Sequence, residues 1–299
     1  MRIFDTNQAT LQALKGSNIE VIVGVVNDDL QGLATSPAAA NTWVQTNIIP
    51  YVPDVKISYI ATGNEIKPSD PLAQYVGLAI QNLNNAITGS NLQIKVSTAI
   101  DMSLLGNHYP PSAGSFSDSA SSYTKTIVSI LVNANAPLFA NVYPYFAYIG
   151  DPTDIKLEYA LFTSPGVVVQ DGNLEYQNLF DAIVDVLYSA LEKIGGANMT
   201  VIVTESGWPS DGNGGVATVD NACTYYKNLI SHVQNGTPKR PGPLETYLFA
   251  LFDEDQKGPA ETEKHYGLFS PTKQPQYQVS FTYGMFSTMY MSLRNNFYL

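Results

Sequence analysis

Cysteine is almost absent from this chain of 299 residues, and its scarcity excludes two kinds of covalent or metal cross-link. Cys223 is the only cysteine, so neither an intrachain disulfide nor a cluster of thiolate metal ligands can form. It lies in VDNACTYYKNLI at helical spacing, which is typical of a buried small hydrophobic residue. Disulfides therefore carry no information about the compartment in which the protein works.

Positive charge and histidine are also scarce. The chain has 15 basic and 26 acidic residues, a net charge of −11. This sign argues against nucleic acid or an anionic membrane as a partner, whereas a neutral substrate is compatible with it. The three histidines, His108, His232 and His265, are scattered without the paired spacing of a zinc site. We therefore expect no metal and no cofactor.

Long apolar segments and a leader peptide are missing as well. No window reaches the roughly 18 uncharged apolar residues that a membrane span needs. Met1 leads directly into the extended stretch MRIFDT, without the basic segment and apolar core of a signal peptide. Two sequons, at Asn198 and Asn235, are a weak indication of secretion.

Strand-like and helical stretches alternate along the whole chain. β-Branched and aromatic runs that predict buried strands lie near residues 1–6, 20–27, 55–65, 94–100, 137–145, 201–207 and 246–254. Apolar residues at helical spacing predict helices near residues 70–87, 121–134, 176–194 and 217–233. This alternation predicts an α/β fold with a parallel sheet and helical crossovers.

The number and spacing of the strands favour a barrel. An open doubly wound sheet usually has a glycine-rich turn after its first strand, and MRIFDTNQAT has no glycine. A (β/α)8 TIM barrel needs eight strands and about 250 residues, which suits the length. Seven strands are visible and the first begins at residue 1. The simplest interpretation is a barrel lacking its first βα unit, with an opening between the MRIFDT strand and the TYLFALFD strand.

Carboxylates stand at three of the predicted strand ends. Glu65 follows Asn64, Glu205 ends VIVTESG, and Glu254 precedes Lys257. A single glutamate there is more often a helix cap or a solvated group, but its recurrence in separate units points to one site. Two facing carboxylates without a metal cluster suit glycoside hydrolysis: one protonates the leaving oxygen, and the other attacks the anomeric carbon or activates water. Ser206 lacks the G-x-S-x-G turn of a hydrolase nucleophile.

The residues carry a resemblance to a known family. The segments ATGNEI, ANVYPYFAY, VVVQDG with YQNLFDA, VTESGWPS and FALFDEDQKGPAETEKHYGLF occur in order, and together they resemble glycoside hydrolase family 17, the plant endo-β-1,3-glucanases. The resemblance covers residues 1–281. It implies a (β/α)8 barrel that hydrolyses β-1,3-glucan with retention of configuration, in plant defence or the turnover of cell-wall glucan.

The resemblance also implies roles for individual residues. The glutamate of its N-E motif, Glu65, would be the acid/base, and that of T-E-S-G-W-P, Glu205, the nucleophile. Lys257 and the dipole of Asn64 would help to keep Glu205 ionised. The other residues that it brings to the site are three flanking the catalytic pair, Glu254, Lys257 and Glu263, and five at substrate-binding positions, Asn64, Asn141, Tyr143, Phe146 and Trp208.

Several alternatives stay open at the level of sequence. Phe146 fits a core aromatic as well as a sugar contact, and Trp208 is either a platform for glucose or a wedge that closes the loop after Glu205. Mixed-linkage β-1,3-1,4-glucan would need the same catalytic pair, and a non-catalytic β-glucan-binding protein is a third interpretation. We expect a catalytic domain at residues 1–281, a poorly ordered extension at 282–299, a monomer, and secretion to the cell wall or transport to the vacuole.

Overall fold

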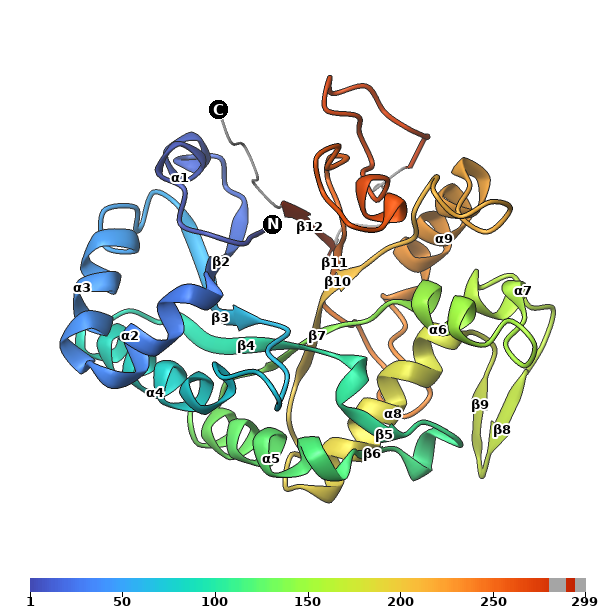
Figure 1. Cartoon of the computed structure of the whole chain (residues 1–299), viewed down its shortest axis with the longest axis horizontal. Coiled ribbons are helices and arrows are strands. Elements are labelled where there is room, and N and C mark those ends of the chain that lie inside the picture. Colours follow the sequence, from blue (N-terminus) through green and yellow to red (C-terminus); the bar gives the residue numbers. More distant parts are fainter. Residues whose placement is uncertain (280–288, 294–299) are drawn as a thin grey trace.

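Eight parallel strands form a closed ring at the centre of the computed structural model, which describes residues 1–279 and 289–293 (Figure 1). Around the ring the order is β1, β12, β11, β10, β7, β4, β3 and β2. The bounds of these strands are β1 Arg2–Ile3, β2 Glu20–Val25, β3 Lys56–Asn64, β4 Lys95–Asp101, β7 Leu138–Asn141, β10 Val201–Ser206, β11 Thr246–Leu248 and β12 Met289–Leu293.

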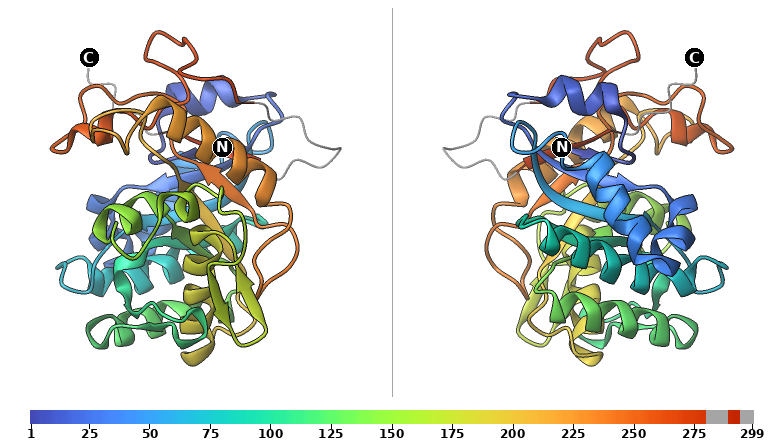
Figure 2. Two further views of the ribbon diagram at one scale, coloured as in Figure 1. Left: turned by 90° about the vertical axis from the view of Figure 1, so that its right-hand side faces the viewer. Right: turned by 90° about the vertical axis from the view of Figure 1, so that its left-hand side faces the viewer.

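Helices cover the outside of the ring (Figures 1 and 2). They are α1 Gln8–Leu14, α2 Leu30–Thr35, α3 Pro37–Asn47, α4 Ala73–Gly89, α5 Asp118–Asn133, α6 Pro144–Gly150, α7 Leu157–Ala160, α8 Leu179–Lys193 and α9 Val219–His232. Two antiparallel hairpins, β5 Leu105–Asn107 with β6 Ser115–Phe116 and β8 Val169–Asp171 with β9 Leu174–Tyr176, lie outside the ring. Short 3-10 helices span Asn27–Asp29, Met102–Leu104, Pro111–Ala113 and Glu261–Lys264. None of the described helices combines the length and the hydropathy that a membrane crossing requires.

The predicted α/β barrel is confirmed, but its expected opening is not. The strand β12 pairs in parallel with β1 on one side and with β11 on the other, at the place where a gap was expected. The ring is closed because a segment within the predicted extension has joined it. Residues 282–288 and 294–299 of that extension lie outside the described residues, as do residues 280 and 281 before it, and the division at residue 281 stays a prediction.

The core has an inner and an outer part. Six buried side chains, one from each of six strands, fill the inside of the ring: Ile22, Ala61, Ala99, Phe139, Ile202 and Tyr247. Tyr59 packs edge-on against Phe139 with 5.6 Å between ring centroids. A second and much larger cluster fills the space between the strands and the helices. Burial on both faces explains why the strands read as continuous apolar runs in the sequence.

Two predicted strands end earlier than expected. The strand at 137–145 stops at Asn141, because Pro144, with its fixed φ, starts α6. The strand at 246–254 stops at Leu248, after which the backbone leaves the ring: the Ala250 amide donates to the Tyr266 carbonyl at 2.9 Å. Both early ends turn the chain away from the barrel at the mouth, where it can form a site.

A buried carboxylate in α8 gives the fold a dependence on pH. Asp185 is fully buried and accepts hydrogen bonds from the Thr237 hydroxyl at 2.5 Å and the Lys239 amide at 2.9 Å. Burial raises the pKa of Asp185 to about 6 despite these hydrogen bonds. The folded protein therefore holds this proton more tightly than the unfolded chain does, and the stabilising contribution of the protonated group is lost as the pH rises through 6.

We expect Asp185→Asn to remove this dependence, because asparagine does not ionise. Each unit of pKa shift corresponds to about 1.4 kcal/mol, so the free energy of unfolding of the variant should rise relative to the wild type by about 2–3 kcal/mol between pH 4 and pH 7. Urea unfolding of both proteins at the two pH values measures the change. If the free energies of unfolding of the two proteins differ by the same amount at both pH values, Asp185 does not titrate in this range.

Candidate active site

Glu205 lies at the mouth of the barrel, one residue before the end of β10. Every residue of this strand is buried, and Glu205 itself is 4% exposed. Gly207 follows because the chain passes very close to the end of the next strand: a Cβ at this position would lie 2.1 Å from the carbonyl oxygen of Phe249. The glycine lets the two strand ends approach each other, and this approach fixes the direction in which Glu205 enters the site.

Glu65 lies directly after the end of β3 and adopts an unusual backbone conformation. Its φ is 55°, in the left-handed region, which costs energy for a residue with a Cβ. Its amide donates to the carbonyl of Ala99 at 2.9 Å, so the neighbouring strand β4 holds the turn in place. Strain of this kind is found where function needs a particular side-chain direction.

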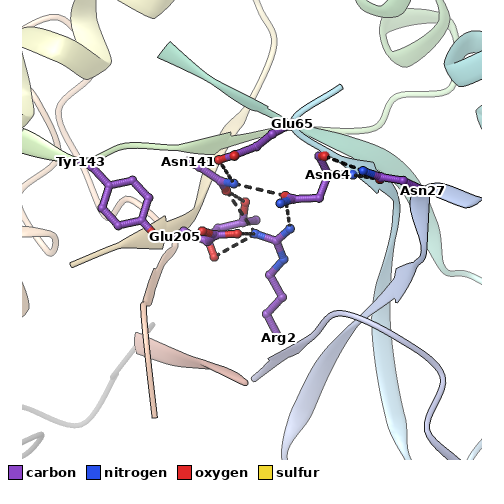
Figure 3. A network of polar contacts seen from close by, with 8 residues as sticks. Arg2, Asn27, Asn64, Glu65, Asn141, Tyr143 and Glu205 are labelled. Carbon is purple, nitrogen blue, oxygen red and sulfur yellow. Dashed lines mark hydrogen bonds and ion pairs between the residues drawn. The ribbon is translucent and has the colours of Figure 1, made fainter. Parts of the chain in front are cut away.

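Arg2 is the cation that contacts Glu205. Its Nη1 lies 2.8 Å from Oε1 of Glu205, and its Nη2 donates to Oδ1 of Asn64 at 2.7 Å (Figure 3). Arg2 is 1% exposed, so the ion pair is shielded from water and from salt. The guanidinium places a positive charge against the Glu205 carboxylate and connects it to the end of β3.

Asn141, the last residue of β7, connects the two glutamates. Its Oδ1 accepts from Nη1 of Arg2 at 3.1 Å and from the Thr204 hydroxyl at 2.9 Å. Its Nδ2 donates to Oε1 of Glu65 at 2.8 Å (Figure 3). Both Oδ1 and Nδ2 of Asn141 therefore make hydrogen bonds, which fixes the orientation of the amide. Asn141 thus joins Glu65 and Glu205 in one hydrogen-bond network.

Tyr143 approaches Glu205 from the side opposite Arg2 (Figure 3). Its hydroxyl donates to Oε2 of Glu205 at 2.7 Å. Burial, and then the negative charge of Glu205, raise the pKa of Tyr143 well above the ordinary value. The hydroxyl therefore keeps its proton, and both oxygens of Glu205 have a donor. Fixed donors on both oxygens hold the carboxylate in one orientation.

Lys257 forms ion pairs with the two other residues expected to flank the catalytic pair. Its Nζ lies 2.7 Å from Glu263 and 3.2 Å from Glu254, and it stands over the ring of Phe249 at 4.7 Å from the centroid. The three residues expected to flank the pair therefore form an ion-pair cluster of their own. Among the described residues, the cation in contact with Glu205 is Arg2.

One large cavity opens over these residues. It has a volume of about 1120 Å³. The predicted site residues that line it are Glu65, Asn141, Tyr143, Phe146, Glu205, Lys257 and Glu263. Phe146 is 44% exposed, so it is available to a ligand and is not a core residue. Asn64 and Glu254 do not line the cavity, but each contacts a residue that does: Asn64 accepts a hydrogen bond from Asn141 at 3.2 Å, and Glu254 pairs with Lys257.

Trp208 does not line the cavity either, which corrects its expected place among the sugar contacts. It is fully buried, and its Nε1 donates to the carbonyl of Val216 at 2.9 Å. Its ring packs edge-on against Tyr145 with 5.2 Å between the centroids. Of the two alternatives, the structure favours the wedge: Trp208 fixes the loop that follows Glu205.

Arg2 is the functional residue that sequence reasoning missed. Its signal was a charged residue at the start of an otherwise apolar strand, RIF, where burial demands a partner. As for metals, the part of the chain that the structure describes contains no group of three or more His, Cys, Asp or Glu placed to hold an ion.

Close relatives of this chain are found among known proteins and solved structures. The family model of glycosyl hydrolases family 17 matches residues 1–281. A glucan endo-1,3-beta-glucosidase of Vitis vinifera is 58% identical over 94% of this chain and 83% of its own length. The basic vacuolar isoform GLB of the same enzyme from Nicotiana tabacum is 53% identical over 94% of this chain and 77% of its own. The solved structure of CJP38, a beta-1,3-glucanase and allergen of Cryptomeria japonica pollen, superposes with a TM-score of 0.91 at 50% identity, covering 95% of this chain and 90% of that one.

Proposed function

Because this chain belongs to family 17 of the glycosyl hydrolases, we propose that it hydrolyses internal β-1,3-glucosidic bonds of β-1,3-glucans. The observation that carries this proposal is the network in which Asn141 and Arg2 connect Glu65 and Glu205 at the mouth of one barrel (Figure 3). Curated relatives at 58% and 53% identity carry the name of this activity, and the chain covers most of their length.

Glu205 is the proposed nucleophile. In the first step its carboxylate attacks the anomeric carbon while the bond to the glycosidic oxygen breaks, which leaves a covalent glycosyl ester and retains configuration after the second displacement. Arg2 and Tyr143 hold the carboxylate in one orientation before the attack. In the second step Arg2 stabilises the negative charge that returns to Glu205 as the ester breaks.

Glu65 is the proposed acid/base. It gives its proton to the departing glycosidic oxygen in the first step and takes a proton from the attacking water in the second. The hydrogen bond from Asn141 holds the carboxyl group of Glu65 in place beside the network of Glu205. Retention is tested by proton NMR of the first product, which should be the β-anomer.

The substrate class follows from charge and shape as well as from the relatives. A neutral polysaccharide meets no repulsion from a chain of net charge −11, and aromatic residues such as Tyr143 and Phe146 offer apolar faces to glucose rings. We expect release of reducing sugar from laminarin to exceed release from barley mixed-linkage glucan. A faster reaction on barley glucan would select the mixed-linkage enzyme, and binding without release would select the non-catalytic protein.

Glu65→Gln tests the acid/base role. Glutamine can still accept the hydrogen bond from Asn141, but it has no proton to give. We expect the rate on laminarin to fall by about 10²–10⁴, whereas formation of the glycosyl ester from an aryl glucoside with a good leaving group should change little, because that group leaves without protonation. Stopped-flow release of the aryl alcohol measures this step.

Azide provides the matched control for Glu65→Gln. It attacks the glycosyl ester without a general base, so it should accelerate turnover of the aryl substrate by this variant. Equal losses on laminarin and on the aryl substrate, with no effect of azide, would remove Glu65 from the acid/base role.

The cellular location and the oligomeric state are further parts of the proposal. We infer a monomer that enters the secretory route and acts in the cell wall space, with the vacuole as the alternative, in plant defence or wall-glucan turnover. The sequon at Asn198 is exposed, which supports this route, and the tobacco relative is named as a vacuolar isoform. Detection of a tagged gene product in the cytosol would contradict the location, and a dimer in size-exclusion chromatography would contradict the monomer.

A further inference from the structure

The strand β12 joins the first and the last of the other ring strands. Its backbone pairs Ser292 with Arg2 and Leu293 with Ile3 on one side. On the other side it runs beside β11, where Met289, Tyr290 and Met291 are paired with the three residues Thr246–Leu248. In Figure 1 it lies beside the N-terminus of the chain. The family model that matches residues 1–281 ends before this strand.

Without β12, both of its neighbours would be edges of the sheet. The strand β1 consists of two residues, which pair on the other side with Ile22 and Val23 of β2. The strand β11 would keep only β10 as a neighbour. Backbone N–H and C=O groups on the open sides would then need new partners.

Both of these neighbours carry residues of the site. The guanidinium of Arg2, in β1, contacts Glu205 and Asn64. The residue after β11, Phe249, packs edge-on against Tyr143 with 6.2 Å between ring centroids, and Tyr143 donates to Glu205. A shift of either strand would therefore move one of the two donors that hold the nucleophile.

We propose that residues 289–293 act within the same chain as the eighth barrel strand, and that they thereby position Arg2 and Tyr143 against Glu205. The effect on catalysis rests on the proposed function, whereas closure of the ring does not. The strand is a positioning element: it acts on the reaction through β1 and β11. An error of about 1 Å in such a position can cost on the order of a hundredfold in rate.

Proline at position 291 tests this proposal in the full chain. Met291 lies in the middle of β12 opposite Leu248, and proline there removes the backbone N–H that a strand with two neighbours uses for pairing. We expect Met291→Pro to lower Tm by about 5 °C or more and kcat on laminarin by about tenfold to a hundredfold, measured well below Tm. Met291→Leu, which keeps the N–H, is the matched control and should behave like the wild type.

Hydrogen exchange distinguishes positioning from general destabilisation. In Met291→Pro the amides of β1 and β11 should exchange faster, while those of β3 and β4, on the far part of the ring, keep their protection. A uniform increase over all strands would contradict the local role. Unchanged exchange and unchanged Tm would overturn the closure itself.

A pair of truncated chains keeps the proposal testable if the proline variant does not fold. Chains ending at residue 288 and at residue 293 differ only by β12. The longer one should have the Tm and kcat of the full chain. The shorter one should have a lower Tm and a lower kcat, and both values should rise again when a synthetic peptide of residues 282–299 is added. Equal Tm of the two truncated chains would overturn the proposal. If the full chain does not hydrolyse laminarin, the proposed function fails, while Tm and hydrogen exchange still decide on the closure.

Discussion

Replacement of Glu205 by glutamine is expected to abolish hydrolysis of laminarin while sugar binding stays nearly intact. Glutamine has the shape of glutamate, but its amide cannot attack the anomeric carbon, so we expect kcat to fall by at least about a thousandfold, or about 4 kcal/mol of transition-state stabilisation. Reducing-sugar assays measure the loss, and calorimetric titration with a laminarin oligosaccharide measures binding. Loss of binding together with activity would contradict this expectation.

The surroundings of Glu205 can accommodate the amide. Its oxygen can take the place of Oε1, where Nη1 of Arg2 donates, and its nitrogen can donate to the Tyr143 hydroxyl, which rotates to accept. The charge of Arg2 is then left without a counter-charge in a buried position, so we also expect a lower Tm. The activity assay must therefore be run well below the Tm of the variant.

Glu175→Gln is the matched control, and covalent labelling is the direct test. Glu175 is exposed on β9 and does not line the cavity, so its replacement should leave kcat unchanged within about twofold. A 2-deoxy-2-fluoro glucoside with a good leaving group slows breakdown of the ester and should add its sugar mass to the peptide that contains Glu205 in the wild type. A label on another carboxylate would assign the nucleophile elsewhere.

The sequence predicted the barrel and indicated the proposed catalytic pair for one physical reason. Strands buried on both faces have continuous apolar sequences, so a carboxylate at the end of such a strand is conspicuous. Glu65 and Glu205 are conspicuous in this way, and parallel strands bring their ends to one mouth. The family resemblance then supplied their roles.

The partners of Glu205 could not be read in the same way. Contact between Arg2 and Glu205 joins residues 203 positions apart, and only the closure of the ring brings them together. Lys257, the expected cation, follows the last predicted strand. The chain changes direction after Leu248, so Lys257 lies against Glu254 and Glu263. Sequence order indicates which residues reach the mouth, and it does not indicate which of them touch.

The eighth strand was the largest departure from expectation. Residues 289–293 lie beyond the segment that carries the family resemblance and show no catalytic motif, so nothing in their sequence predicted a place in the ring. Pairing in a sheet depends on backbone groups that every sequence possesses. A segment that reaches the space between β1 and β11 can therefore pair with the backbone groups of both strands.

Arg2→Met should lower the rate of the reaction strongly, and it should act mainly on the second step. The guanidinium stabilises negative charge on Glu205, which disappears when the glycosyl ester forms and returns when the ester breaks. Loss of the cation makes the carboxylate a poorer leaving group. We expect kcat on laminarin to fall by about 10²–10³, and a burst of aryl alcohol from an activated substrate, because the ester accumulates.

Arg2→Lys separates the charge of Arg2 from its geometry. Lysine keeps the positive charge, but it cannot bond Glu205 and Asn64 with two nitrogens of one planar group, as Nη1 and Nη2 do at 2.8 and 2.7 Å. If charge dominates, the lysine variant should lose only about tenfold in kcat and show no burst. A loss as large as that of Arg2→Met would mean that the fork geometry, and not the charge, is what the second step needs.

The double variant Arg2→Met/Glu205→Gln tests the ion pair through its effect on the free energy of unfolding. Each single change leaves one buried charge without its partner, at a cost of about 3–5 kcal/mol, whereas the double change removes both charges. Its free energy of unfolding should therefore lie above the value expected from adding the two single losses. Urea unfolding of the four proteins measures this coupling. Additive losses would mean that Arg2 and Glu205 do not stabilise each other, and the accumulation of ester in Arg2→Met would then need another cause.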